Sequence, residues 1–510
     1  MFHSILFERP EDGPLSGPVE EPEFFGDLNL GQMVSEATKG FAEYNLAPFF
    51  YTPLSRTDAI AFRHEVMRDL ENPVVLASVK VFADGMRTMR LRLAQAERLY
   101  YPLQKQWWLL ESARTYSEAL SSFANALEAA EPQSKGLRAF QRYLSSYIAS
   151  DQFHALVSDA DAVKCDLDAV QYCTLVKGNA VTVRHYDGER DYSAEVLSIF
   201  EKFKQGAAKE RCDAPRDSLD MNHVEAQVLD CVARLEPQPF TKLAVFCAQH
   251  ADFLDTVVAT FDREVQFYLA YAAYLDPCRA QDLSFCYPQI STGSKVTRCE
   301  DTFDIVLAHK LATEKARVVC NDLYLKEGEH LIVVSGPNNG GKTTFARMFG
   351  QLHYLSRLGF PVPGCNARLF LCDALFTHFE REENTQDMRG KLRDDLIRIH
   401  DVLTRATPKS VIVMNEIFSS TTLTDALFLS KRVISEILEL GALCLCVTFI
   451  EELARMSDVG VSMVSEVDPA KPTLRTYRIR RREPGSEAYA MSVARQYRLT
   501  YEQLTERLGL

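Results

Sequence analysis

The sequence predicts a mostly α-helical region followed by an α/β domain with a largely parallel sheet. Apolar residues recur at helical spacing through residues 26–280, whereas short apolar runs alternate with helical stretches through residues 281–510. A chain of 510 residues exceeds what one hydrophobic core usually supports, so we expect two or three domains. Residues 1–25 are rich in proline, glutamate and glycine and predict an extended or disordered lead-in.

The clearest helical pattern runs from Val75 to Leu127, with one interruption at Pro102. Apolar residues recur there every three or four positions: Met89, Leu93, Ala96, Leu99, Leu110, Ala113, Tyr116 and Leu120. This pattern fits the core of a helical bundle. It also fits a long lever arm bent at the proline, which would carry signals from a distant site. Both interpretations stay open, because pattern alone seldom separates them.

Residues 172–196 interrupt the helical pattern. Two β-prone runs flank a turn at Gly178 and Asn179, so we expect a small antiparallel hairpin that projects from the helices. After Asp276-Pro277 the pattern changes to short strands and helices, which places the domain boundary near residue 280.

Composition argues for a cytoplasmic protein without a membrane segment or a zinc site. The 13 cysteines are scattered and form no Cys-x-x-Cys pair, and no apolar run approaches the length of a membrane-spanning helix. Cys444 and Cys446 lie in an apolar run and are expected to act as small buried hydrophobes. The net charge of −13 argues against indiscriminate nucleic-acid binding but leaves room for a local basic groove.

The most specific motif is a glycine-rich loop. The apolar run Leu331–Val334 leads into Gly-x4-Gly-Lys-Thr, and a helical pattern follows from Thr344. In such a P-loop, backbone N–H groups and a helix N-terminus surround the phosphates of ATP. Lys342 would reach the β- and γ-phosphates, and the Thr343 hydroxyl would bind Mg²⁺. The expected nucleotide-binding residues are Gly336, Pro337, Asn338, Asn339, Gly340, Gly341, Lys342, Thr343 and Thr344.

An acidic residue at the end of a neighbouring strand is the second requirement for phosphoryl transfer. The apolar run from Val411 ends in Asn415 and Glu416, about seventy residues after the loop. We expect Glu416 to orient the attacking water, which makes Glu416 and Lys342 the candidate catalytic residues. Thr343, Asn415 and Glu416 are the candidate metal site. Asn415 offers an amide oxygen without a charge, so weaker metal binding and slow hydrolysis are expected.

These motifs resemble those of the MutS family. The loop is similar to the family's Gly-Pro-Asn-Met-Gly-Gly-Lys-Ser-Thr, and Asn415–Thr421 stands where the family has Asp-Glu-Ile-Gly-Arg-Gly-Thr, with Asp425 retained. Three further segments resemble family elements: Val319–Leu323, Gly359–Pro363 and Thr448–Leu453. The resemblance covers residues 280–510 and extends more loosely to a core-and-lever region that begins near Phe25. It implies an ABC-type P-loop ATPase domain that dimerises, and arms that open and close with ATP.

The chain departs from the family pattern at several positions. Asn415 replaces an aspartate, Phe449 replaces a histidine near the γ-phosphate, and residues 390–395 replace a Ser-Thr-rich loop. We find no Phe-x-Glu mismatch wedge, so the resemblance is to a divergent, shortened relative without the mismatch-recognition domain. Ser419–Thr422 is expected either near the dimer interface or as a helix N-cap cluster, and both can hold.

The resemblance implies an ATP-dependent clamp that acts as a homodimer on mismatched, distorted or branched DNA. Basic residues that could contact phosphates are Arg87, Arg90, Arg92, Arg98, Lys177 and the run Arg478–Arg482, although a solvated surface is the commoner role for such residues. Two alternatives remain. One is a nucleotide-switched scaffold with little turnover, which Asn415 and Phe449 motivate. The other is an ATPase that acts on RNA or ribosomes.

Overall fold

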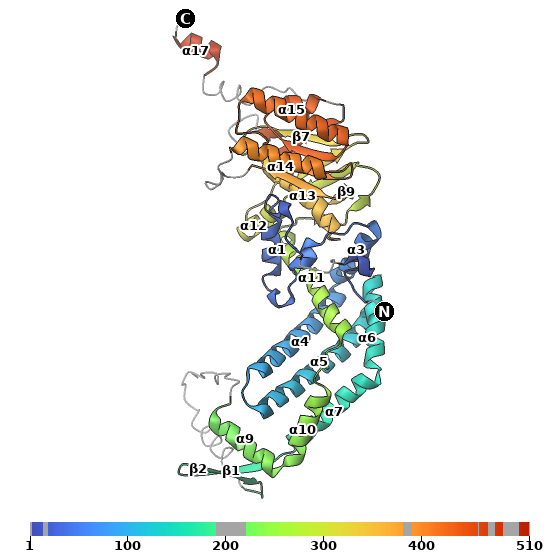
Figure 1. Ribbon diagram of the computed structural model, residues 1–510, viewed down its shortest axis with the longest axis vertical. Helices are drawn as coiled ribbons and strands as arrows, with labels where there is room; N and C mark the ends of the chain where they lie inside the picture. The colour runs from blue at the N-terminus through green and yellow to red at the C-terminus, as the bar shows by residue number, and fades with distance from the viewer. Residues whose placement is uncertain are drawn as a thin grey trace. The chain divides into compact units, whose positions relative to one another are not determined.

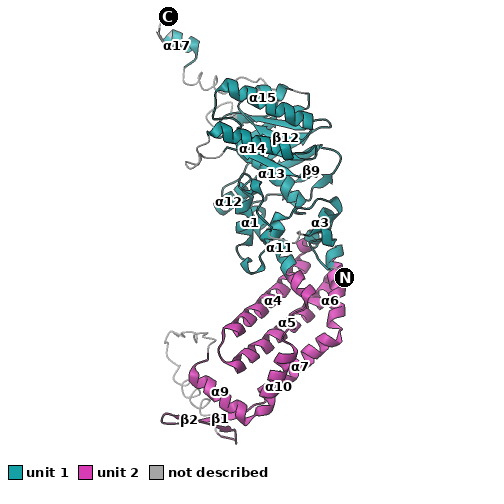
Figure 2. Ribbon diagram, viewed as in Figure 1, with its two compact units in different colours: residues 1–69, 133–137, 263–510 teal, residues 70–132, 138–262 magenta. Residues whose placement is uncertain are grey.

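The computed structural model describes residues 3–13, 19–189, 221–380, 390–456, 458–467, 475–482 and 499–508 (Figure 1). The chain forms two compact units (Figure 2). Unit 1 comprises residues 1–69, 133–137 and 263–510, and unit 2 comprises residues 70–132 and 138–262. The first 69 residues and the second part of α11 (Thr256–Arg279) thus group with the α/β domain.

Unit 1 is built on a six-stranded sheet with the order β10-β11-β12-β7-β13-β14. Its strands are β7 (Leu331–Ser335), β10 (Leu375–Phe379), β11 (Val411–Asn415), β12 (Leu443–Val447), β13 (Gly460–Val467) and β14 (Arg475–Arg481). Strands β10, β11, β12, β7 and β13 are parallel, and β14 pairs antiparallel with β13. The predicted α/β domain with a largely parallel sheet is therefore confirmed.

Three helices accompany this sheet: α13 (Lys342–Arg357), α14 (Lys391–Arg405) and α15 (Leu423–Leu440). Apolar residues of α14 and α15 share a buried core with Leu331, Ile412 and Cys444. Cys444 and Cys446 are fully buried on β12, as predicted for small hydrophobes, and burial raises the pKa of the Cys446 thiol to about 12. Strands β7, β11 and β12 are buried along their whole length, which explains their uninterrupted apolar runs.

Smaller elements complete unit 1. The strands β3 (Phe285–Cys286) and β8 (Val362–Pro363) form a pair, and β4 (Gln289–Ser291), β9 (Asn366–Phe370), β5 (Thr297–Thr302) and β6 (Asn321–Leu325) form a four-stranded sheet in that order. The helices are α1 (Leu30–Thr38), α2 (Ala47–Tyr51), α3 (Thr57–Glu71), α12 (Ile305–Thr313) and α17 (Tyr501–Leu508). The 3-10 turns are η1 (Pro10–Asp12), η2 (Glu23–Phe25), η3 (Ala42–Tyr44) and η4 (Glu451–Arg455).

The N-terminal residues differ from the extended or disordered lead-in that composition predicts. Ile5, Leu6 and Phe7 are buried. The Tyr268 hydroxyl donates to the Ile5 carbonyl over 2.7 Å, and the Ile5 amide donates to the Glu264 carboxylate over 2.7 Å. These contacts come from residues more than 250 positions away, so local composition gave no sign of them.

Arg63 links this N-terminal segment to the end of α13. The fully buried guanidinium donates from Nε to the Leu6 carbonyl and from Nη1 to the Leu358 carbonyl, each over 2.9 Å. It also lies over the rings of Phe7 and Phe267. Burial lowers the pKa of Arg63 to about 10, which leaves the side chain charged at neutral pH.

In unit 2 the predicted long helical pattern is a hairpin of two antiparallel helices, α4 (Pro73–Arg98) and α5 (Pro102–Ala130). Phe82 stacks on Phe123 with ring centroids 4.4 Å apart, and Arg92, nearer the turn, bonds to Thr115. A single helix bent at Pro102 is therefore wrong. The proline occupies the first turn of α5, where a missing N–H costs nothing, and the chain reverses just before it.

The remaining helices of unit 2 are α6 (Lys135–Ile148), α7 (Asp151–Asp168), α9 (His223–Leu235), α10 (Pro237–Gln249) and the first residues of α11. The predicted hairpin is present as β1 (Tyr172–Lys177) and β2 (Ala180–His185), which pair antiparallel around Gly178 and Asn179. Residues 190–196 of the predicted range lie outside the described residues.

The Asp69 side chain connects the two points of the chain at which residues 70–132 begin and end. Its carboxylate accepts hydrogen bonds from the backbone amides of Gln133 over 3.1 Å and Ser134 over 2.7 Å. Asp69, Gln133 and Ser134 all belong to unit 1. Residues 70–132 therefore leave unit 1 and return to it at the same place.

Candidate nucleotide site

The glycine-rich loop lies between β7 and α13, in the strand–loop–helix arrangement that the sequence predicts. Gly341 has φ of 90° and precedes Lys342, the first residue of α13. Gly336 has φ of 128°, and a side chain there would place its Cβ 2.8 Å from that of Ser465. Glycine is required at both positions because other residues rarely adopt this backbone, and the loop can then turn its N–H groups inward.

Lys342 folds back over the loop. Its ammonium group donates to the carbonyls of Gly336 over 2.9 Å and Pro337 over 3.1 Å. It also lies 4.4 Å from the centre of the Phe449 ring. Burial lowers the pKa of Lys342, and the nearby Glu416 carboxylate acts in the opposite direction.

Thr343 and Asn415 meet at the end of β11. The Thr343 hydroxyl donates to the Asn415 side-chain oxygen over 3.1 Å. The sequence motif predicts β11 beside the strand that enters the loop, and this is wrong, because β12 lies between β7 and β11. The contact forms because Thr343, one residue into α13, lies near the carboxyl end of β11.

Glu416 follows β11 with a left-handed backbone, at φ of 55°. Its amide donates to the Val447 carbonyl over 2.9 Å, and its half-buried side chain lines the same pocket as Lys342 and Thr343. The structure thus brings the two candidate catalytic residues and the candidate metal residues into one neighbourhood.

In the loop after Glu416, the hydroxyl of Thr422 acts as the helix N-cap that the sequence predicts as one alternative. Thr422 caps α15, because its hydroxyl oxygen accepts from the Asp425 amide over 3.3 Å. Ser419 donates to Glu380 over 3.0 Å, and Glu380 also bonds to Lys391. Ser419 and Glu380 tie the end of β10 to the loop after β11.

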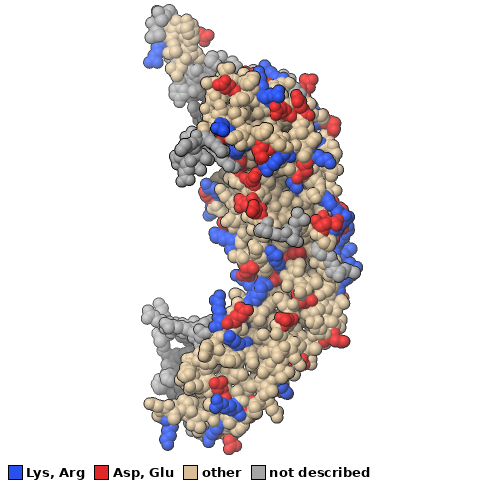
Figure 3. Space-filling view, viewed as in Figure 1, with Lys and Arg blue, Asp and Glu red and all other residues tan. Residues whose placement is uncertain are grey.

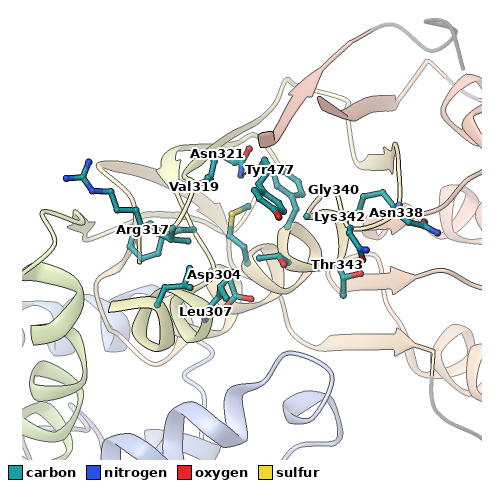
Figure 4. A pocket seen from close by; sticks show the side chains of 18 of the residues that line it. Asp304, Leu307, Arg317, Val319, Asn321, Asn338, Gly340, Lys342, Thr343 and Tyr477 are labelled. Carbon is teal, nitrogen blue, oxygen red and sulfur yellow. Dashed lines mark hydrogen bonds between the residues drawn. The ribbon is translucent and has the colours of Figure 1, made fainter. Parts of the chain in front are cut away.

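A pocket of about 870 Å³ extends from the glycine-rich loop to a wall formed by residues 303–321 (Figure 4). The loop residues and Glu416 line one part. Apolar side chains line the other, among them Phe303, Leu307, Val318 and Val319. Tyr477, from β14, lies beside the loop and faces the same space. The pocket therefore combines an amide-rich end with an apolar and aromatic end.

Side chains of β13 and β14 donate hydrogen bonds to backbone carbonyls of the glycine-rich loop. Ser465 donates to the Gly340 carbonyl over 2.7 Å, and Arg475 donates to the Asn338 carbonyl over 3.1 Å. No sequence motif marks Ser465, Arg475 or Tyr477, which lie more than 120 positions after the loop, so their part in the site was not predicted.

Comparison with known proteins agrees with this geometry. Residues 332–504 match the family model of MutS domain V. The match places this region of the chain in the MutS family. The chain is 30% identical over 161 residues to the DNA mismatch repair protein MutS of Shouchella clausii, which covers 30% of this chain and 18% of that protein. It is 27% identical over 248 residues to the Endonuclease MutS2 of Gemmatimonas aurantiaca, covering 48% of this chain and 29% of that protein. The matched region thus spans less than a third of the length of either relative.

This site differs from the MutS-family motif that it resembles at two residues and in one segment. Asn415 is buried and uncharged where a carboxylate is expected. Phe449 is 53% exposed and presents its ring to Lys342. Residues 391–395 form the first turn of α14, in place of a Ser-Thr-rich loop.

Several candidate DNA-contacting residues form ion pairs within the chain. Arg90 pairs with Asp262, Arg481 pairs with Glu329, and Arg480 and Arg482 both pair with Glu466. On the face shown in Figure 3, basic and acidic side chains are interspersed. These pairs reduce the positive charge that Arg480–Arg482 could offer to a phosphate backbone.

Among the described residues, no group of three or more His, Cys, Asp or Glu side chains could hold a metal ion. Among the helices in the described ranges, none is long and apolar enough to cross a bilayer.

Proposed function

We propose that this MutS-family chain binds ATP with Mg²⁺ in the pocket of the glycine-rich loop and hydrolyses it slowly, as an ATP-dependent clamp on DNA. One observation carries the proposal. Two parts of the chain meet at this pocket: Thr343 of the loop bonds to Asn415, 72 positions away, and the adjacent Glu416 lines the same pocket as the loop. A glycine-rich turn that matched the motif by chance would not bring these residues together.

The loop end of the pocket suits the phosphates. Its backbone amides and the N-terminus of α13 supply partial positive charge, and Lys342 adds a full charge. The ammonium group of Lys342 now bonds to two loop carbonyls, and bound phosphate oxygens would take their place. Thr343 and Asn415 would hold Mg²⁺, which neutralises charge on the phosphates during transfer.

Glu416 would position the attacking water. Its left-handed backbone turns the side chain away from the line of β11 and into the pocket that Lys342 and Thr343 share. A carboxylate there accepts a hydrogen bond from water and directs it in line with the terminal phosphate. Because Asn415 adds no charge, metal binding is weaker and the chemical step is slow.

The apolar end suits the base. Val318 and Val319 line one side of the pocket, and Tyr477 offers an aromatic ring half exposed to solvent. Stacking on an aromatic ring and contact with apolar side chains favour a planar purine. An adenine nucleotide therefore fits both ends of the pocket.

The proposals of a DNA ligand and of a homodimer rest on similarity to the relatives. Relatives at 26–30% identity are DNA mismatch repair proteins. We propose that two copies of the ATPase domain associate and that ATP binding shifts the population of DNA-bound states. A second candidate is a nucleotide switch with little turnover, which the uncharged Asn415 and the Phe449–Lys342 contact favour.

Steady-state ATP hydrolysis with Mg²⁺, measured alone and with homoduplex, mismatched and branched DNA, tests the proposal. Glu416→Ala should lower turnover about 100-fold while ATP still binds. Lys342→Ala should weaken ATP binding about 100-fold, whereas Lys310→Ala, which removes an exposed lysine of α12, should not.

Each outcome has a distinct meaning. A turnover that responds to one form of DNA supports the clamp and identifies its ligand. Equal, near-background rates for wild type and Glu416→Ala, with ATP bound, indicate the switch. Failure of the wild-type chain to bind ATP would refute both.

A further inference from the structure

Asn321 is the first residue of β6, and its side chain bonds to two backbone groups of β14. Its Nδ2 donates to the Tyr477 carbonyl over 3.2 Å, and its Oδ1 accepts from the Ile479 amide over 2.7 Å. Figure 4 shows Asn321 and Tyr477 side by side at the pocket. Both residues line that pocket. One amide side chain thus uses a donor and an acceptor to fix this part of β14.

The segment that Asn321 holds is irregular. Ser465 pairs with Ile479 and Val467 with Arg475, so residues 476–478 lie opposite the single residue Glu466. Tyr477 is the middle residue of this bulge and has φ of 56°. A tyrosine rarely adopts a left-handed backbone, and such strain persists only where surrounding contacts impose it. Asn321 provides two of those contacts.

The bulge places Tyr477 directly against the phosphate loop. A Cβ built on Gly341 would lie 3.7–3.8 Å from atoms of Tyr477, which is ordinary van der Waals contact. Asn321 also follows Val318 and Val319, which line the apolar end of the pocket. The same residue therefore connects the apolar wall to the aromatic ring opposite the loop.

We propose that Asn321 is a positioning residue for nucleotide binding, which sets the Tyr477 ring at the place where the base of the nucleotide stacks. This inference rests on the proposed function and extends it. The Asn321 side chain bonds to β14 rather than to the phosphate loop. It acts through Tyr477, and its effect is confined to the part of the ligand that carries the base.

The chemistry of the two bonds explains why an amide is required. An aspartate of the same length could accept from Ile479 but could not donate to the Tyr477 carbonyl, and its charge would repel that oxygen. An alanine would leave both backbone groups without their partners. In either variant the bulge loses support and the ring loses its fixed position.

Binding of Mg-ADP and of Mg-pyrophosphate, measured by calorimetry on the full chain, separates a base-specific role from a general one, because pyrophosphate has no base. Asn321→Ala and Tyr477→Ala should each weaken ADP binding about tenfold and leave pyrophosphate binding unchanged. The double variant should bind ADP no more weakly than Tyr477→Ala. Asp322→Asn, on the next residue of β6, is the matched control and should bind both ligands like the wild type.

The other outcomes overturn the inference. Equal losses for ADP and pyrophosphate would show that Asn321 supports the phosphate loop as a whole. Unchanged ADP binding in Asn321→Ala, or additive losses in the double variant, would show that it does not act through Tyr477. If Asn321→Ala does not fold, Asn321→Asp provides the same comparison. A wild-type chain that binds neither ligand would refute the proposed function itself, which is a separate result.

Discussion

The Thr343 hydroxyl and the Asn415 side-chain oxygen lie 3.1 Å apart and share a hydrogen bond, so the two groups expected to hold Mg²⁺ are already adjacent. Neither group carries a charge. A magnesium ion prefers oxygen ligands and usually keeps one or two carboxylates in its shell. The proposed Mg²⁺ site therefore supplies oxygen ligands but little electrostatic attraction.

Asn415→Asp should therefore strengthen the metal site. The added carboxylate still accepts the Thr343 hydrogen bond and contributes a full negative charge, so the Mg²⁺ concentration that half-saturates ATP hydrolysis should fall about tenfold. A titration of hydrolysis against Mg²⁺ measures this. Asn45→Asp, at an exposed left-handed position, is the control for added charge. An unchanged Mg²⁺ requirement in Asn415→Asp would argue that this residue does not contribute to metal binding.

Phe449→His should raise ATP turnover about tenfold. An imidazole N–H can donate to charge that develops on the phosphoryl group, whereas the phenyl ring only contacts Lys342, at 4.4 Å. Phe449→Leu removes the ring without adding a donor and should leave the rate near that of wild type. If leucine and histidine raise the rate equally, release of Lys342 from the ring is the cause.

His353 on α13 should make the protein less stable in mild acid. Burial lowers the pKa of His353 to about 4, whereas an unfolded histidine titrates near 6.5. Between these values the unfolded chain binds a proton that the folded chain does not, so stability falls as the pH drops from 6.5 towards 4. The loss from this residue should be about 1 kcal/mol at pH 5.5.

Urea unfolding of the wild type at pH 7.5 and pH 5.5 measures this loss. His353→Gln should reduce the difference between the two pH values. His400→Gln, which replaces an exposed histidine of α14, should leave it as in the wild type. The same pH dependence in wild type and His353→Gln would assign the effect to other groups.

Arg63→Ala should destabilise unit 1 by about 3 kcal/mol, because it leaves the buried Leu6 and Leu358 carbonyls without a donor and removes a cation close to Glu264. Urea denaturation is the measurement, and Arg68→Ala, at an exposed position of the same helix, is the control. A loss equal to that of the control would show that water replaces the guanidinium at no cost.

The α/β domain and the phosphate loop could be predicted because their signals are local. A buried strand such as β7 is a continuous apolar run, and the glycines after it are required by the backbone that they adopt. The β1–β2 hairpin was equally clear from Gly178 and Asn179. In each case the residues that define the element are its own.

Elements that depend on distant partners could not be predicted. Two antiparallel helices have the same apolar spacing as one long helix, and Pro102 is compatible with a bend or with a first turn. Burial of Ile5–Phe7 depends on Arg63, Glu264 and Tyr268. In the site, Tyr477 could not be predicted, because its position depends on a bulge in β14 that no residue type marks.

The hydrogen bonds of Asp69 have a consequence for the length of the α4–α5 hairpin. Because the amides of Gln133 and Ser134 are bound to one carboxylate of Asp69, residues 70–132 begin and end at adjoining points of unit 1. Whole turns can be added to or removed from both arms of the α4–α5 hairpin without moving its ends. The length of residues 70–132 can thus change while unit 1 keeps the same backbone path on either side of them.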